Sequence, residues 1–177
     1  MNSPNLQETL YLQGQAFDIV SFDKDSFVMN WSLEAGDTVG THFHDKVEEH
    51  LLILEGTLEF KLNGKREVRT KGEEILIPAN LVHSIYNVSG NTTRCVVTYT
   101  PCNDLEKSFA ILFSLRPDNR LNMSDLFTYF YIARGLGIKK WFLVHPPIVM
   151  KILMFTGYVV GKLAGWDKKV NELKGKI

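Results

Sequence analysis

The sequence predicts an all-β core of two packed antiparallel sheets, followed by a C-terminal α-helical extension. Between residues 17 and 100, short runs of alternating apolar and polar residues recur with turn residues between them. Within this region Asn63-Gly64 is a strong two-residue hairpin signal, and it joins expected strands at 57–62 and 65–70. After Pro101 the spacing of the apolar residues becomes helical.

These changes in pattern divide the 177 residues into three segments. Residues 1–16 are expected to form an N-terminal arm, residues 17–100 a β-barrel domain, and residues 101–177 a helical extension. A chain of this length accommodates one domain plus an appendage.

The extension contains three expected helices. Asn103, with Glu106 three residues later, is an N-cap pair for the first helix. The second helix is expected at about 124–134. The third is expected at about 148–164, where two prolines favour its start and Gly165 provides a C-terminal stop.

The third helix is largely apolar and has glycines four residues apart, a spacing that lets two helices approach closely. Its two lysines, Lys151 and Lys162, leave only residues 152–161 uncharged between them. A membrane span needs roughly 20 apolar residues, so we expect this helix to pack on the barrel or on a second subunit. Peripheral contact with a membrane is the alternative, because tryptophans and C-terminal lysines accompany the helix.

Composition excludes some classes of function. Twenty basic and twenty acidic residues cancel, so no overall charge attracts nucleic acid or an anionic membrane. Cys95 and Cys102 are too few for a disulfide framework. Residues 1–15 are polar and show no signal-peptide pattern. We therefore expect a cytoplasmic protein that does not bind nucleic acid.

A cluster of metal-binding residue types is the strongest functional signal. His42 and His44 share one face of an extended strand, because alternate residues point the same way. Glu49 follows a polar stretch that can turn, which allows its carboxylate to swing back toward the histidines. Glu48 is the alternative ligand, but the six-residue interval from Glu49 to Gly56 favours Glu49.

A second segment supplies a third imidazole. His83, Ile85 and Asn87 share one face of an expected strand. Three neutral imidazoles and a carboxylate suit Fe(II), Mn(II), Ni(II), Cu(II) or Zn(II). Four protein ligands on a six-coordinate ion leave two positions for water, dioxygen or a bidentate substrate. The residues therefore predict one divalent transition metal ion in a partly open site.

The spacing of these residues resembles both sequence motifs of the cupin superfamily. The residues that match are Gly36, His42, His44, Glu49 and Gly56 in the first motif, and Gly72, Pro78, His83 and Asn87 in the second. Asn80 stands where the family usually has glycine, and Asn tolerates positive φ better than other non-glycine residues. The resemblance covers roughly residues 17–100 and implies a compact mono-cupin, with a double-stranded β-helix or jelly-roll barrel that often pairs as a homodimer.

The expected substrate cavity is the barrel interior, and its walls are apolar. The expected lining residues are Leu51, Ile53 and Ile85, with Met29 and Trp31 as additions. Asn87 and Tyr99 are further candidates for contact with the metal ligands or the substrate. The alternatives are that Asn87 ties down a loop and that Tyr99 packs in the core. Such a lining favours an aromatic or aliphatic small molecule with one or two oxygen donors.

Cupins include dioxygenases, isomerases, decarboxylases and non-catalytic ligand sensors, so the resemblance does not fix the reaction. Our leading hypothesis is a metal-dependent oxidoreductase of dioxygenase type, in which Glu49 both binds the metal and transfers protons. The alternatives are a non-enzymatic metal-dependent binding module and a cupin isomerase or decarboxylase.

Overall fold

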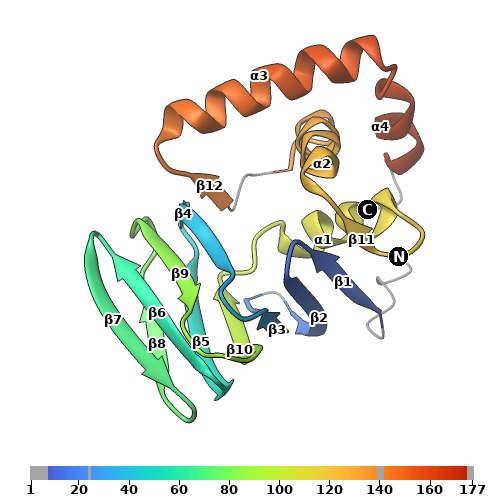
Figure 1. The fold of residues 1–177 in the computed structure, drawn as a ribbon. Coiled ribbons are helices and arrows are strands. Elements are labelled where there is room, and N and C mark those ends of the chain that lie inside the picture. The colour runs from blue at the N-terminus through green and yellow to red at the C-terminus, as the bar shows by residue number, and fades with distance from the viewer. Residues whose placement is uncertain (1–7, 24, 139–141, 175–177) are drawn as a thin grey trace.

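The computed structural model describes residues 8–23, 25–138 and 142–174, which form two β-sheets and a set of helices (Figure 1). The larger sheet contains, in spatial order, β11 (Arg120–Leu121), β1 (Thr9–Leu12), β2 (Gln15–Phe22), β3 (Phe27–Leu33), β10 (Thr93–Thr100), β5 (Glu48–Glu55) and β8 (Glu74–Ile77). The smaller sheet contains β12 (Phe142–Val144), β4 (Thr38–His44), β9 (His83–Asn87), β6 (Thr57–Leu62) and β7 (Lys65–Thr70).

Side chains that alternate along the strands fill the space between the sheets, as expected for strands with one buried face. The buried residues of β3 are Phe27, Met29, Trp31 and Leu33, and those of β10 include Cys95, Val97 and Tyr99. This two-sheet core, followed by helices, confirms the predicted fold class. The predicted hairpin is also confirmed: β6 and β7 pair in antiparallel register, and Asn63 and Gly64 take the positive φ values that a tight turn requires.

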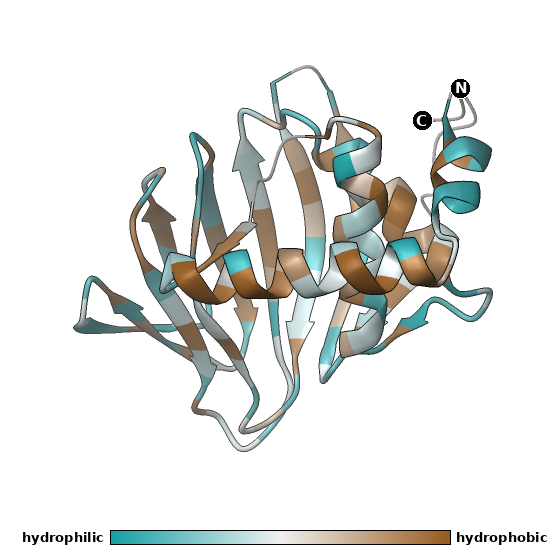
Figure 2. Cartoon of the chain, turned by 90° about the horizontal axis from the view of Figure 1, so that it is seen from above, coloured by the Kyte–Doolittle hydropathy of each residue, from teal (hydrophilic) through white to brown (hydrophobic). Residues whose placement is uncertain are grey.

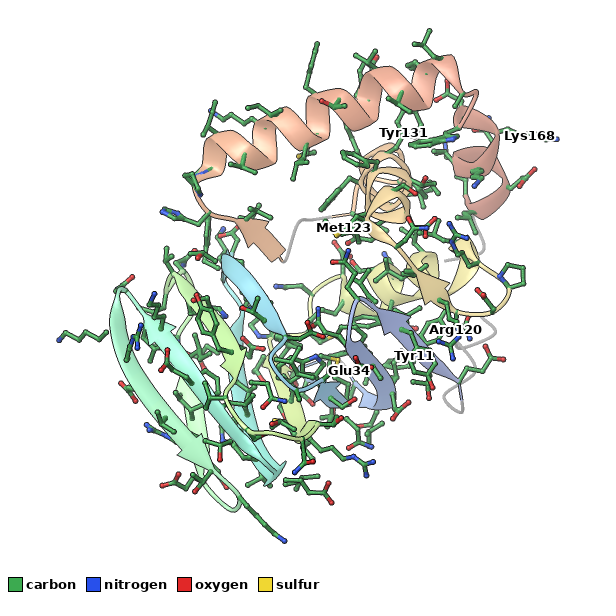
Figure 3. All side chains as sticks on the ribbon, in the orientation of Figure 1. Tyr11, Glu34, Arg120, Met123, Tyr131 and Lys168 are labelled. Carbon is green, nitrogen blue, oxygen red and sulfur yellow. The ribbon has the colours of Figure 1, made fainter. Side chains whose placement is uncertain are left out.

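The predicted N-terminal arm contributes to the larger sheet. β1 and the start of β2 lie within residues 1–16, and Leu10 of β1 is buried. β1 pairs in parallel with β11, which precedes the second helix. The Arg120 guanidinium lies 4.6 Å from the centre of the Tyr11 ring, and Figure 3 shows the two side chains next to each other. Strand β1 is therefore held against the helical extension.

Four helices follow the barrel in the described part of the chain. They are α1 (Leu105–Leu115), α2 (Met123–Gly135), α3 (Pro147–Leu163) and α4 (Asp167–Leu173). The predicted cap of α1 at Asn103 is wrong: Asn103 has a φ of 47°, and α1 starts without a side-chain cap at Asp104. The extended backbone that an N-cap requires is incompatible with the left-handed conformation of Asn103.

Helix α3 lies across α2 (Figure 1), and its glycines face that helix. A Cβ atom on Gly161 would lie 2.3 Å from the Tyr131 ring, and one on Gly157 would lie 3.4 Å from the Phe127 ring. The glycines therefore permit the close crossing that their spacing predicts, with α2 of the same chain as the partner. Tyr131 lies between the two helices in Figure 3.

Among the helices of the described residues, no single one is long and apolar enough to cross a membrane. Helices α3 and α4 reach the required length and composition only as a pair, and that pair is bent by 93°.

Candidate metal centre

The structure brings together the four residues predicted as metal ligands. His42 and His44 lie at the end of β4 with their side chains in the interior. The chain then turns at residues 45–47, where Lys46 has a φ of 58°, and Glu49 enters β5 with its carboxylate directed back toward the histidines. His83 opens β9 and is paired directly with His42 across the two strands. Glu48, the alternative ligand, is exposed.

The cluster is tight and buried. The Glu49 Oε2 atom lies 3.2 Å from His44 Nε2 and 3.1 Å from His83 Nε2. The ring centres of His42 and His83 are 4.1 Å apart. One potential ligand atom from each of the four residues lies within 4.8 Å of the others, and each residue is at most 4% exposed. This is the compact, water-shielded donor set that a transition metal ion requires.

Backbone carbonyls orient two of the imidazoles. His42 Nδ1 lies 2.7 Å from the Gly40 carbonyl oxygen, and His83 Nδ1 lies 2.9 Å from that of Leu81. A ring nitrogen that donates to a carbonyl must carry a hydrogen, so Nδ1 is the protonated nitrogen in both rings. Nε2 is thereby left as the ligand atom, which is the arrangement typical of metal-binding histidines.

Asn80, the departure from the cupin motif, lies in the turn before β9. Its φ is 65°, so it takes the left-handed conformation expected of the residue at this position. Its N–H donates to the His44 carbonyl at 2.9 Å. The turn that places His83 is therefore anchored to the strand that carries the other two histidines.

The electrostatics of the cluster favour neutral His42 and ionised Glu49. Burial and, to a smaller extent, the neighbouring His83 and His44 together lower the pKa of His42 to about 3. Burial alone would raise the pKa of Glu49, but hydrogen bonds and charge interactions with His44 and His83 hold it well below its usual value. Burial would also lower the pKa of His83, yet the hydrogen bond to Glu49 and its charge raise it. The charge of Glu49 thus favours a positive charge at His83, as it would favour a bound cation.

Tyr99 positions the carboxylate. Its hydroxyl donates to Glu49 Oε1 at 2.9 Å, whereas Oε2 faces the histidines. Burial and the negative charge of Glu49 raise the pKa of Tyr99 well above its usual value, so the phenol remains a hydrogen-bond donor. The two oxygens of Glu49 therefore have different roles: one is held by Tyr99 and the other is presented to the cluster.

Asn87, predicted as a contact of the site or substrate, ties down a loop. Its amide nitrogen lies within 3.0 Å of the carbonyl oxygens of Leu33, Glu34 and Asn91, and its side-chain oxygen accepts from the Ser89 N–H at 2.9 Å. The side-chain amide of Asn87 therefore forms its hydrogen bonds with backbone groups near β3 and β10. His50 does not join the cluster: its Nε2 atom lies 3.0 Å from Glu74 Oε2 at the surface.

A cavity of about 1150 Å³ opens beside the cluster. His42, Glu49 and Tyr99 contribute to its wall. The predicted lining residues Met29, Trp31 and Ile85 also line it, whereas Leu51 and Ile53 do not. Leu51 and Ile53 point to the same face of β5 as Glu49. They lie further along the strand, where they are fully buried in the core.

Much of the cavity wall comes from outside the barrel motifs. Its apolar residues from other elements include Leu10 of β1, Phe109 and Leu112 of α1, Phe130 of α2, and Leu153 and Met154 of α3. His145 also contributes to the wall. The helical periodicity marks the apolar faces of α1 and α2, but no signal in the sequence shows that those faces border the barrel mouth.

Comparison with known proteins identifies the β region. The family model described as "Cupin domain" matches residues 29–99. A quercetin 2,3-dioxygenase of Bacillus subtilis is 32% identical over 77 residues, which are 44% of this chain and 22% of that protein. A polyketide synthase, CurC, of Streptomyces cyaneus is 28% identical over 69 residues, which are 39% of this chain and 45% of that protein. The chain thus spans less than half the length of either curated relative.

A solved structure shows the same fold. The crystal structure of an RmlC-like cupin from Shewanella frigidimarina is 18% identical, covers 56% of this chain and 88% of that chain, and has a TM-score of 0.50. Identity this low supports the fold alone.

Proposed function

Residues 29–99 of this chain form a cupin domain, and we propose that the protein is a metal-dependent oxidoreductase of dioxygenase type. The observation that carries the proposal is the opening of a buried three-histidine, one-carboxylate cluster onto a large, mainly apolar cavity. The ligands would be His42, His44, Glu49 and His83. The substrate would be an apolar small molecule with oxygen atoms that reach the cluster.

The residues present fit a divalent transition metal. Fe(II), Mn(II), Ni(II), Cu(II) and Zn(II) all accept imidazole and carboxylate ligands, and the donor set does not choose among them. A metal ion held by His42, His44, Glu49 and His83 would supply Lewis-acid chemistry toward the oxygen atoms of a substrate.

The chain's own residues have four tasks in this proposal. His42 remains available as a ligand because it stays neutral across the physiological pH range. Tyr99 fixes the rotation of the Glu49 carboxylate through Oε1. Oε2 can then accept the proton of a substrate hydroxyl, and the low pKa of Glu49 favours rapid release of that proton. The apolar wall of the cavity excludes water from the reacting end of the substrate.

The similarity to a quercetin 2,3-dioxygenase supports this reaction class, since it covers 44% of the present chain. The polyketide synthase relative supports a substrate of comparable character, an oxygenated organic molecule. In this proposal, residues 17–100 provide the metal ligands, and residues 101–177 provide much of the surface that contacts the substrate.

Dioxygen consumption by the metal-loaded protein tests the proposal. The full chain is reconstituted separately with Fe(II), Mn(II), Ni(II), Cu(II) and Zn(II), and oxygen uptake is recorded with quercetin as the probe substrate. We expect uptake with at least one redox-active metal, and incorporation of label from ¹⁸O₂ into the product. The His42→Ala, His83→Ala double variant should be inactive, whereas His50→Ala, which changes a histidine outside the cluster, should retain activity.

Two outcomes would contradict the proposal. Turnover at an undiminished rate without dioxygen would indicate an isomerase or decarboxylase. Tight, metal-dependent binding of quercetin without any turnover would indicate a non-enzymatic binding module.

A further inference from the structure

Helix α3 presents a row of large apolar side chains to the outside of the molecule. Five of them recur at intervals of four or three residues, which places them on one face of the helix. We call this set the outer stripe: Ile148, Ile152, Phe155, Val159 and Leu163. These residues are 41–86% exposed, and no described part of the chain covers them. Figure 2 views the molecule from the α3 side and shows the helix as a mainly hydrophobic band across it.

The opposite face of α3 accounts for its packing within the chain. Gly157 and Gly161 lie against α2, and Leu153 and Met154 line the cavity. The outer stripe therefore has no role in the intramolecular contacts of α3. Scattered exposed apolar residues are ordinary, but a contiguous row along four turns of one helix marks an interaction surface.

The charges around the outer stripe indicate the kind of partner. Lys151 and Lys162 are separated by about three helical turns, so they lie on the same side of α3. Helix α3 contains no Asp or Glu, so both of its charged residues are basic. Lys168 and Lys169 follow on α4, and Figure 3 shows Lys168 near the C-terminal end of α3.

A second copy of α3 would complement this surface poorly, because it would offer its own lysines and no carboxylate to them. An anionic lipid surface complements both parts: acyl chains accept the apolar row, and phosphates accept the lysines. The neutral overall charge of the protein does not oppose this, since α3 and α4 together carry four lysines against two carboxylates, Asp167 and Glu172.

We propose that α3 is an interfacial helix that docks this protein onto an anionic phospholipid membrane. The outer stripe inserts at the boundary between headgroups and acyl chains, and Lys151 extends toward the phosphates. Lys162 is paired with Asp167 of α4 at 2.7 Å, so Lys151 is the lysine of α3 that we assign to the phosphates. The helix lies in the plane of the membrane and does not cross it. The proposal does not depend on the chemistry of the metal centre.

Vesicle co-sedimentation of the full chain tests this docking. The probes are vesicles of phosphatidylcholine and phosphatidylglycerol in equal amounts, with pure phosphatidylcholine vesicles for comparison. The wild-type chain should bind the anionic vesicles more tightly, and added salt should weaken that binding. A triple variant, Ile152→Ser, Phe155→Ser and Leu163→Ser, should bind at least about tenfold more weakly because it buries less apolar surface.

Two further variants separate the contributions. Lys151→Gln should weaken binding to the anionic vesicles about fivefold, as expected for one lysine near a charged surface. The matched control is a second triple variant, Val68→Ser, Leu76→Ser and Val88→Ser, which changes exposed apolar residues on the barrel. This control should bind like the wild type. Circular dichroism and metal content verify that each variant is folded.

The proposal is overturned if the wild type does not bind the anionic vesicles, or if the outer-stripe variant binds them as well as the control does. Sedimentation of the free protein identifies the competing partner. A dimer that is lost in the outer-stripe variant, together with no vesicle binding by the wild type, would show that a second copy covers the stripe.

Discussion

Acidification should destabilise the metal-free protein through His42. Burial and the neighbouring imidazoles lower the pKa of this histidine from 6.5 to about 3 in the folded chain. When the pH falls below 6.5, the unfolded chain binds a proton at His42 and the folded chain does not. The unfolded state therefore binds more protons, and the free energy of unfolding falls as the pH falls.

The magnitude follows from the two pKa values. Between pH 6.0 and pH 4.5, the linkage relation gives a loss of about 2 kcal/mol from His42. Glu49, whose pKa is also lowered in the fold, contributes in the same direction toward the lower end of this window. His83 has a raised pKa, so its contribution is fully present below 6.5 and is lost only at higher pH. It therefore changes little between pH 6.0 and pH 4.5.

Urea unfolding measures this loss. The protein is freed of metal with a chelator, and unfolding curves are recorded at pH 6.0 and pH 4.5 for the wild type and for His42→Gln. With a slope of about 2 kcal/mol per molar urea, His42 should account for a shift of about 1 M in the midpoint. The variant lacks the titrating ring but keeps the other acidic groups, so the difference between the two proteins isolates His42. Equal shifts in the two proteins would refute the reasoning.

Three further predictions concern the metal centre and its surroundings. The double variant His42→Ala, His83→Ala should lose a near-stoichiometric metal content that elemental analysis detects in the wild type; equal content in both would refute the ligand assignment. Tyr99→Phe removes the hydrogen bond to Glu49 and should weaken metal binding by about tenfold in calorimetric titration, and unchanged affinity would show that the carboxylate is held without Tyr99. Asn87→Ala should lower the free energy of unfolding by about 3 kcal/mol in urea while leaving the metal content unchanged, because the buried backbone groups that it satisfies lose their partner. Metal loss in that variant would instead connect the loop to the site.

The local parts of the fold were predictable because the signals for them are local. The Asn63-Gly64 turn requires two positive φ values, and few other residue pairs adopt them readily. The return of Glu49 toward His44 also depends on a short turn whose polar residues are visible in the sequence. The start of α1 shows the limit of such signals, since the left-handed conformation of Asn103 overrides its preference for an N-cap position.

The parts that the sequence did not predict depend on contacts between distant segments. The pairing of Tyr99 with Glu49 joins residues 50 positions apart; the strand pattern makes Tyr99 a candidate for contact with the site but does not indicate which residue it contacts. Leu51 and Ile53 were placed on the correct face of β5, but periodicity does not indicate how far along a strand a cavity extends. The positions of α1 and α2 beside the cavity likewise depend on tertiary packing, and helix propensity does not indicate where a helix will pack.

The metal cluster and the rest of the cavity wall are encoded in different stretches of the chain. The predicted ligands all fall between His42 and His83, whereas the wall extends from Leu10 in β1 to Met154 in α3. Substitutions in α1 or α3 can therefore change the shape of the cavity without touching a ligand. Conversely, the motif residues place a metal-binding geometry in the chain but specify little of the surface that a substrate would meet. The predicted ligands and the wall of the adjoining cavity are thus separate features of the chain, and residues 101–177 contribute to the second but not to the first.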